Sequence, residues 1–185
     1  MEIKKFGIRE VVAMGIGTAL FVVLTTVQIP CGIPNTYLQP RMAVLAFFSA
    51  IFGPIVGAVV GLLGHALGDA IFYGSVWWSW VFPEAVTGIL VGCFAKKFAV
   101  QEGGFITAPN IILFNIVQIA ANAIAWIVAA PILDIVVYAE PAKKVFSQGV
   151  VAFVGNIIVI GVLGTLVLVG YSKASGNSQG LKKED

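Results

Sequence analysis

Apolar residues form long runs along this chain, and glycine, proline and polar residues separate the runs. They cover residues 8–28, 40–52, 54–72, 80–98, 109–130 and 145–171. A bilayer crossing needs about 20 apolar residues, and a helix is the default for such a run because it satisfies its own backbone hydrogen bonds in lipid. The pattern therefore predicts an all-α integral membrane protein with six transmembrane helices. The run 40–52 is short for a crossing.

The composition agrees with this class. Hydrophobic residues make up 59% of the 185 residues and charged residues 11%, which excludes an ordinary soluble domain. The net charge of +2 is too small and too scattered to indicate nucleic-acid binding. Cys31 and Cys93 do not have the spacing of a metal or redox motif. We therefore expect two unpaired cysteines, no metal site and no cofactor.

Lysine and arginine set the orientation, because six spans place both termini on the same side. That side carries Lys4, Lys5, Arg9, Lys96, Lys97, Lys173, Lys182 and Lys183, and the other carries Arg41, Lys143 and Lys144. Cytoplasmic loops are enriched in these residues, so both termini are predicted to be cytoplasmic. Residues 1–172 are expected to form one transmembrane domain, and the polar stretch 173–185 a disordered cytoplasmic tail.

Three loops on the outer side are predicted to be structured. Their aromatic and acidic residues are Tyr37, Tyr73, Trp77, Trp78, Trp80, Asp134, Tyr138 and Glu140. Aromatic residues at this depth form either an interfacial belt or the wall of a binding surface. Because all four tryptophans of the chain lie toward the outer half, the asymmetry favours a binding surface.

Ionisable residues inside apolar spans are costly and are candidates for function. His65 and Asp69 are four residues apart and share a helix face. Counted from the turn between their helices, Arg41 and Asp69 lie at similar heights, about 18 and 23 Å at about 1.5 Å per residue. We expect these two to pair across a helical hairpin, either as a structural ion pair or in contact with a ligand. Glu84 is a further candidate.

Polar residues also follow one another at helical spacing in 109–130. The stripe consists of Asn115, Gln118, Asn122 and Trp126. Amide side chains often join helices in membranes, which is the expectation for Asn115. For Asn122 and Trp126, nearer the outer side, ligand contact and helix packing both stay open. Gln148 and Asn156 are candidates to face the same interior.

Small residues at four-residue spacing mark the first apolar run. Ala13 and Gly17 form one pair, and Gly15 and Ala19 form another. Such pairs let two helix backbones approach closely in a membrane. The pattern predicts that a partner helix docks on 8–28, in this chain or in another protein, and leaves open which pair is used.

No motif for catalysis or ATP hydrolysis is present. The sequence has no nucleotide-binding glycine loop, no HExxH motif and no hydrolase serine in its strand–turn–helix context. We expect no catalytic residues. Two other functions stay open. One is an intramembrane enzyme, which requires His65, Asp69 and Glu84 to converge. The other is a scaffold or channel that self-associates through 8–28.

Six segments cover nearly the whole chain and carry a family resemblance. They read VVAMGIGTALFVVL, IFGPIVGAVVGLLGHALGD, WWSWV, NIVQIAANAIAW, APILDIVVYAEPAKKVFSQG and GNIIVIGVLGTL. The chain resembles the substrate-binding S components of energy-coupling factor (ECF) transporters, and more narrowly uncharacterised protein family 0397.

The resemblance implies a location, a mechanism and partners. S components lie in the bacterial plasma membrane, bind a vitamin-like molecule on the outer face, and dock on a transmembrane coupling protein that works with two cytosolic ATPases. Their first helix presents the docking surface, here Ala13, Gly15, Gly17 and Ala19. Cobalamin is the first substrate expected, followed by methionine-related compounds or thiamine precursors. The substrate-binding residues expected are Tyr37, Arg41, His65, Asp69, Trp77, Trp78, Trp80, Glu84, Asn122, Trp126 and Tyr138.

Overall fold

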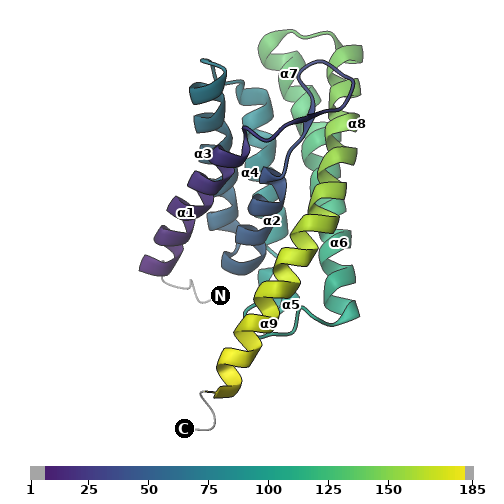
Figure 1. Cartoon of the computed structure of the whole chain (residues 1–185). Coiled ribbons are helices and arrows are strands. Elements are labelled where there is room, and N and C mark those ends of the chain that lie inside the picture. Colours follow the sequence, from purple (N-terminus) through teal and green to yellow (C-terminus); the bar gives the residue numbers. More distant parts are fainter. Residues whose placement is uncertain (1–6, 182–185) are drawn as a thin grey trace.

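The computed structural model describes residues 7–181, which are mostly helical (Figure 1). The helices are α1 (Ile8–Leu24), α2 (Arg41–Phe52), α3 (Pro54–Phe72), α4 (Trp78–Gly92), α5 (Ala95–Phe98), α6 (Ala108–Asn122), α7 (Ala130–Tyr138), α8 (Ala142–Val159) and α9 (Thr165–Leu181). Two π-helical segments, η1 (Ala123–Ala129) and η2 (Ile160–Gly164), join α6 to α7 and α8 to α9. Strands β1 (Ile29–Pro30) and β2 (Tyr37–Leu38) form a short antiparallel hairpin.

Each of the six apolar runs is helical over most of its length. Within residues 7–181, three helices are long and apolar enough to cross a membrane: Pro54–Phe72, Ala108–Tyr138 and Ala142–Gly176. The remaining helices are shorter than a full crossing requires. The structure therefore agrees with an all-α membrane protein, while six crossings and cytoplasmic termini stay predictions.

Two helices continue beyond their predicted ends, whereas α1 ends at Leu24 instead of 28 and α4 ends at Gly92 instead of 98. The helix expected to end at 130 continues to Tyr138 through Pro131. Pro131 is the second residue of α7, immediately beyond η1, and the wider π turn leaves room for a ring that an α turn would press against a carbonyl. The last helix continues to Leu181, so the backbone over 173–181 is helical where a disordered tail was expected. Residues 182–185 of that tail lie outside the described residues.

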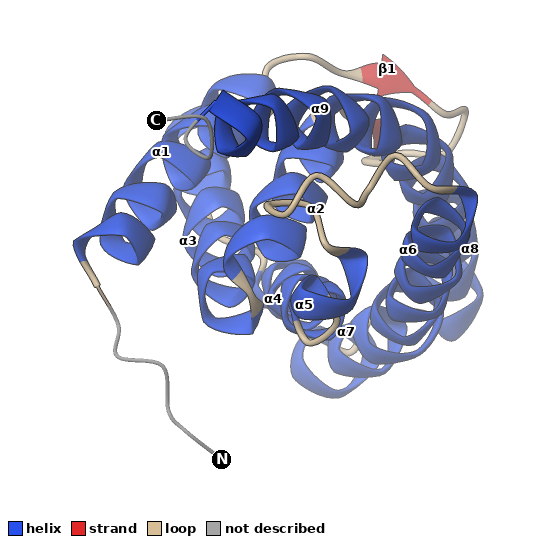
Figure 2. Ribbon diagram, turned by 90° about the horizontal axis from the view of Figure 1, so that it is seen from below, coloured by secondary structure: helices blue, strands red, loops and turns tan. Residues whose placement is uncertain are grey.

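The two ends of the bundle carry different elements. In Figure 1 the start of α1, the short α5 and the end of α9 lie at one end, and the hairpin and the α7–α8 connection lie toward the other. Viewed from below, α2 lies inside a ring of the other helices (Figure 2), and most of its residues are buried. Since protein rather than lipid surrounds α2, its 12 residues suffice.

Helix α1 packs on the rest of the chain through one of its two small-residue pairs. Ala13 and Gly17 are buried, and a Cβ at Gly17 would lie 2.7 Å from Cγ2 of Val60 on α3. Gly15 has nothing within 4 Å of a Cβ position, and Ala19 is exposed. The partner of the Ala13–Gly17 pair is therefore inside this chain, and Gly15 and Ala19 face outward.

Helices α3 and α4 form the most extensive helix–helix contact among the described residues. A Cβ at Gly57 would lie 2.5 Å from the carbonyl oxygen of Gly88, and a Cβ at Gly88 would lie closer still to the carbonyl oxygen of Gly57. Both positions therefore require glycine. One turn further along, a Cβ at Gly61 would lie 2.7 Å from the carbonyl oxygen of Glu84. The absence of side chains here brings Glu84 against α3.

Gly88→Ala should destabilise the protein, because the backbone of α3 cannot rotate aside as a side chain can. Overpacking costs about 1–3 kcal/mol, and we expect the upper part of that range in the free energy of unfolding in detergent. Gly170→Ala on α9 is the matched control, since a Cβ there meets nothing within 4 Å. Equal stabilities of the two variants would contradict the backbone contact.

Candidate functional site

A pocket of about 320 Å³ lies at the end of the bundle that carries the hairpin. This volume is within the range of small-molecule sites. The hairpin, the adjoining ends of α2, α3 and α4, and parts of η1, α7 and α8 enclose it. The lining consists of Asn35, Thr36, Tyr37, Gln39, Arg41, Met42, His65, Asp69, Tyr73, Ser75, Trp77, Trp80, Glu84, Trp126, Asp134, Lys144, Gln148, Ala152 and Asn156.

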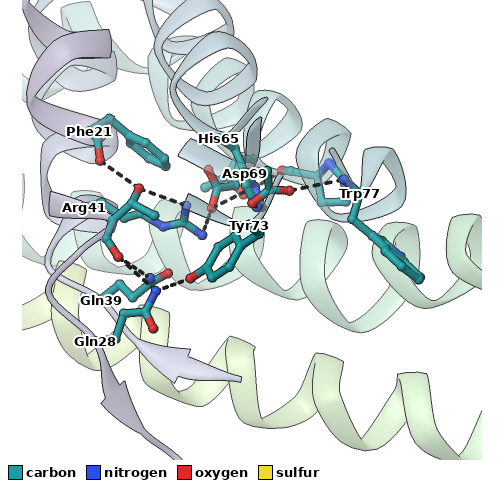
Figure 3. A network of polar contacts seen from close by, with 12 residues as sticks. Phe21, Gln28, Gln39, Arg41, His65, Asp69, Tyr73 and Trp77 are labelled. Atoms are coloured by element: carbon teal, nitrogen blue, oxygen red, sulfur yellow. Dashed lines mark hydrogen bonds and ion pairs between the residues drawn. The ribbon is translucent and has the colours of Figure 1, made fainter. Parts of the chain in front are cut away.

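Four buried ionisable side chains meet at this pocket, and we call Arg41, His65, Asp69 and Glu84 the ion cluster. Nη2 of Arg41 lies 3.2 Å from Oε1 of Glu84, and Nδ1 of His65 lies 3.4 Å from the same oxygen. Nε2 of His65 lies 3.4 Å from Oδ1 of Asp69 (Figure 3). A buried charge is costly unless a partner compensates it, so each member of the ion cluster depends on the others.

The prediction that Arg41 pairs with Asp69 is wrong. Arg41 pairs with Glu84, and Asp69 contacts His65 instead. The rise per residue gave similar heights for Arg41 and Asp69, but height does not fix the direction in which a side chain points around its helix. The close approach of α4 to α3 brings Glu84 to Arg41, and the sequence does not reveal that approach.

The other side of the Arg41 guanidinium contacts the end of α1. Its Nη1 donates to Oγ1 of Thr25 at 3.4 Å, and its central carbon lies 4.9 Å from the centre of the Phe21 ring. The carbonyl oxygen of Thr25 accepts amide hydrogen bonds from Gln28 (3.0 Å) and Gln39 (3.2 Å). These contacts join the end of α1, the hairpin and the start of α2 (Figure 3).

Two carboxylates hold the tryptophans at the start of α4. Oδ1 of Asp134 accepts the indole N–H of Trp77 and the hydroxyl of Ser79, both at 2.6 Å. Oδ2 of Asp134 accepts the indole N–H of Trp80 at 3.0 Å. Asp69 accepts the backbone N–H of Trp77 at 3.2 Å. The aromatic wall of the pocket is thus fixed by hydrogen bonds from two different helices.

The structure brings most of the expected substrate-binding residues together. Those that line the pocket are Tyr37, Arg41, His65, Asp69, Trp77, Trp80, Glu84 and Trp126. Trp78, Asn122 and Tyr138 lie outside the lining. Trp78 is exposed beside Phe82, and Tyr138 stacks on Trp77 with ring centres 4.6 Å apart. Asn122 is fully buried and donates to the carbonyl oxygen of Gln118 at 2.8 Å.

The rest of the polar stripe joins helices. The amide of Asn115 donates to Oγ1 of Thr165 on α9 at 3.2 Å, and the amide of Gln118 donates to the carbonyl oxygen of Ile157 on α8 at 3.4 Å. The packing role expected for Asn115 is confirmed. Gln148 and Asn156 both line the pocket, so they face the same interior as Trp126.

Five buried polar atoms on pocket-lining residues have no hydrogen-bond partner within the described residues. They are Nε of Arg41, Nδ1 of His65, both carboxylate oxygens of Glu84 and Nε1 of Trp126. Buried polar groups are nearly always satisfied in native proteins. Each of these atoms has almost no accessible surface, so a ligand in the pocket reaches one of them only when a neighbouring side chain shifts.

Sequence reasoning left several lining residues out of the binding set. Asp134 is the most consequential, and it had been placed in an outer loop. Tyr73 and Gln39 also line the pocket. Asp69 was selected because it is an acidic residue inside an apolar helix. Asp134 meets the same criterion once the helix is continued beyond residue 130.

The three groups required for an intramembrane enzyme do converge, because His65 contacts both Asp69 and Glu84. Convergence alone does not distinguish catalysis from binding. Within residues 7–181, no group of three or more His, Cys, Asp or Glu side chains is arranged to hold a metal ion.

Comparison with known proteins identifies the family to which this chain belongs. A family model described as the S component of ECF-type riboflavin transporters matches residues 5–173. A UPF0397 protein of Exiguobacterium sp. is 49% identical over 180 residues, which cover 97% of this chain and 98% of that protein. UPF0397 proteins of Streptococcus gordonii (49% over 179 residues; 97% and 96% covered) and Lactobacillus helveticus (48% over 186 residues; 100% of both) are similarly related.

The chain belongs to the family of S components of ECF-type transporters, and the resemblance read from the sequence is confirmed. S components are in general non-catalytic subunits of membrane transporters. Family membership therefore favours binding over catalysis as the role of the ion cluster.

Arg41→Met should destabilise the protein strongly, because it leaves Glu84 buried without its cationic partner. Breaking a buried pair in this way costs about 3–5 kcal/mol, measured as the free energy of unfolding in detergent. Lys144→Met is the control, since its ion pair with Glu140 is partly exposed and such pairs contribute about 1 kcal/mol or less. A similar small loss for both variants would show that the ion cluster does not stabilise the fold.

Proposed function

We propose that this chain captures a vitamin-like small molecule from outside the cell and delivers it to a transmembrane coupling protein served by two cytosolic ATPases. The carrying observation is the pocket at the hairpin end, whose lining combines aromatic rings with buried ionisable side chains. In this proposal the chain spans the bacterial plasma membrane six times, with both termini in the cytoplasm and the pocket facing outward.

The distribution of basic residues supports this orientation. Arg9 on α1, Lys96 and Lys97 on α5, and Lys173 on α9 belong to the end of the bundle opposite the hairpin (Figure 1). Cytoplasmic ends of membrane proteins are rich in lysine and arginine. At the hairpin end, Arg41 and Lys144 are each paired with a carboxylate.

The residues that line the pocket favour a flat heteroaromatic substrate that is neutral or positively charged. Tryptophan and tyrosine rings form much of its wall and offer stacking surfaces. Both cations of the lining, Arg41 and Lys144, already have carboxylate partners, so a strong anion such as a phosphate ester gains little there. Asp134 has only neutral donors around it, which adds negative charge to the wall.

Riboflavin, named in the description of the matching family model, and thiamine precursors both meet this description. Cobalamin, the first substrate expected from the resemblance, is a much larger molecule than a cavity of about 320 Å³ encloses. Most of a bound cobalamin would therefore lie outside the pocket. Methionine-related compounds would leave the aromatic wall without a ring to stack on it.

A ligand panel tests the substrate class. Riboflavin or a thiamine precursor should raise the thermal stability of the purified protein in detergent, by about 2.7 kcal/mol at a concentration 100 times its Kd. Trp126→Ala removes an aromatic ring from the lining of the pocket, and should weaken binding about tenfold. Trp78→Ala, outside the lining, is the control. Stabilisation by cobalamin alone would overturn the substrate class, and stabilisation by no compound would overturn ligand capture.

The outward-facing pair on α1 supports a docking role. Ala13 and Gly17 already pack inside this chain, which leaves Gly15 and Ala19 for a second protein. The exposed side chains around them are apolar and include Ile16 and Leu20. We therefore assign the coupling protein to the Gly15–Ala19 face.

Gly15→Leu and Ala19→Leu should abolish ATP-driven uptake by the assembled transporter and leave ligand binding unchanged. A leucine on this face separates two closely packed backbones, whereas a Cβ at Gly15 meets nothing inside this chain. Gly170→Leu, at an exposed position on α9, should retain uptake. Gly17→Leu should instead lower stability. Normal uptake by both Gly15→Leu and Ala19→Leu would exclude this face.

A further inference from the structure

Asp134 is a buried carboxylate whose contacts all lead to one short segment. Its two oxygens accept hydrogen bonds from the indole N–H groups of Trp77 and Trp80 and from the hydroxyl of Ser79, at 2.6 to 3.0 Å. Only 2% of Asp134 is exposed. These contacts cross more than 50 positions of sequence, so they join α7 to the start of α4.

The same helix holds these tryptophans by their rings as well. The ring of Tyr138 stacks on Trp77 with 4.6 Å between centres, and the ring of Trp126 lies 5.8 Å from that of Trp80. Trp126, Asp134 and Tyr138 all belong to the continuous helix Ala108–Tyr138. Each indole is thus fixed at its polar edge by Asp134 and on its ring by an aromatic neighbour.

We propose that Asp134 is a positioning residue, which orients Trp77 and Trp80 for ligand binding before the ligand arrives. This inference rests on the proposed function of the pocket. A tryptophan that is already ordered loses no rotamer freedom when a ligand packs on it, and prior ordering of this kind increases affinity. A carboxylate suits the task, because its two oxygens can accept several bonds at once.

An amide at the same position cannot reproduce this arrangement. Asparagine is nearly the same size, but it offers one acceptor oxygen, and its NH2 group would face an indole N–H. At least one tryptophan would lose its bond in Asp134→Asn. Ser79→Ala is the matched control, since it removes one bond from Asp134 and leaves both indole bonds in place.

The first measurement needs no ligand and no variant of Asp134. In full-length protein labelled with 15N-tryptophan, the indole N–H signals of Trp77 and Trp80 should lie downfield and exchange slowly with solvent. The signal of Trp126, whose Nε1 has no partner in the described chain, should show no such downfield shift. Signals of Trp77 and Trp80 that resemble free indole would overturn the proposal, whether or not Asp134→Asn folds.

The second measurement compares the variants. Asp134→Asn should shift at least one of the two indole signals, speed its exchange, and raise the Kd of the ligand identified by the panel about tenfold or more. Ser79→Ala should keep both signals and stay within about twofold of the original Kd. Altered signals with an unchanged Kd would leave Asp134 as a structural anchor and overturn the positioning role. If no compound binds, the proposed function fails, and the indole signals alone decide whether Asp134 orders the tryptophans.

Discussion

The backbone contact between α3 and α4 is the constraint on which the rest of this structure depends. Glycines at the crossing points remove the side chains that would otherwise separate the two helices. Close packing at small residues is a principal source of helix association in membranes, where lipid is as apolar as the helices themselves. As a direct result, the carboxylate of Glu84 lies among α2 and α3 rather than on a separate surface.

From Glu84 the polar contacts extend in two directions. Through Arg41 they reach Thr25 at the end of α1, and through His65 they reach Asp69 and then the backbone of Trp77. Groups in a low-dielectric interior strengthen one another when all are satisfied and are costly when one partner is missing. The helix assigned to docking and the helices that form the pocket therefore share one set of buried interactions.

The long apolar runs, and the glycines and prolines that separate them, predicted where the helices lie, because burial in lipid or protein demands such runs. They did not predict the partner of Arg41, since sequence spacing gives the height of a residue along a helix but not which neighbouring helix it faces. Asp134 was missed for a different reason. Ending a helix at Pro131 placed Asp134 in a loop, and the π segment that lets the helix continue has no visible signature in the sequence.

That π segment also changes which deletions the chain can accept. A π turn completes the same rotation as an α turn with about one more residue, so deleting one residue within 123–129 would let the helix return to α geometry. The residues beyond the deletion would keep nearly the same orientation, and Asp134 and Tyr138 would still face their tryptophan partners. The same deletion in the regular α-helix on either side would turn everything beyond it by about 100° around the axis. The length of this helix is therefore less constrained at its π segment than in its α-helical parts.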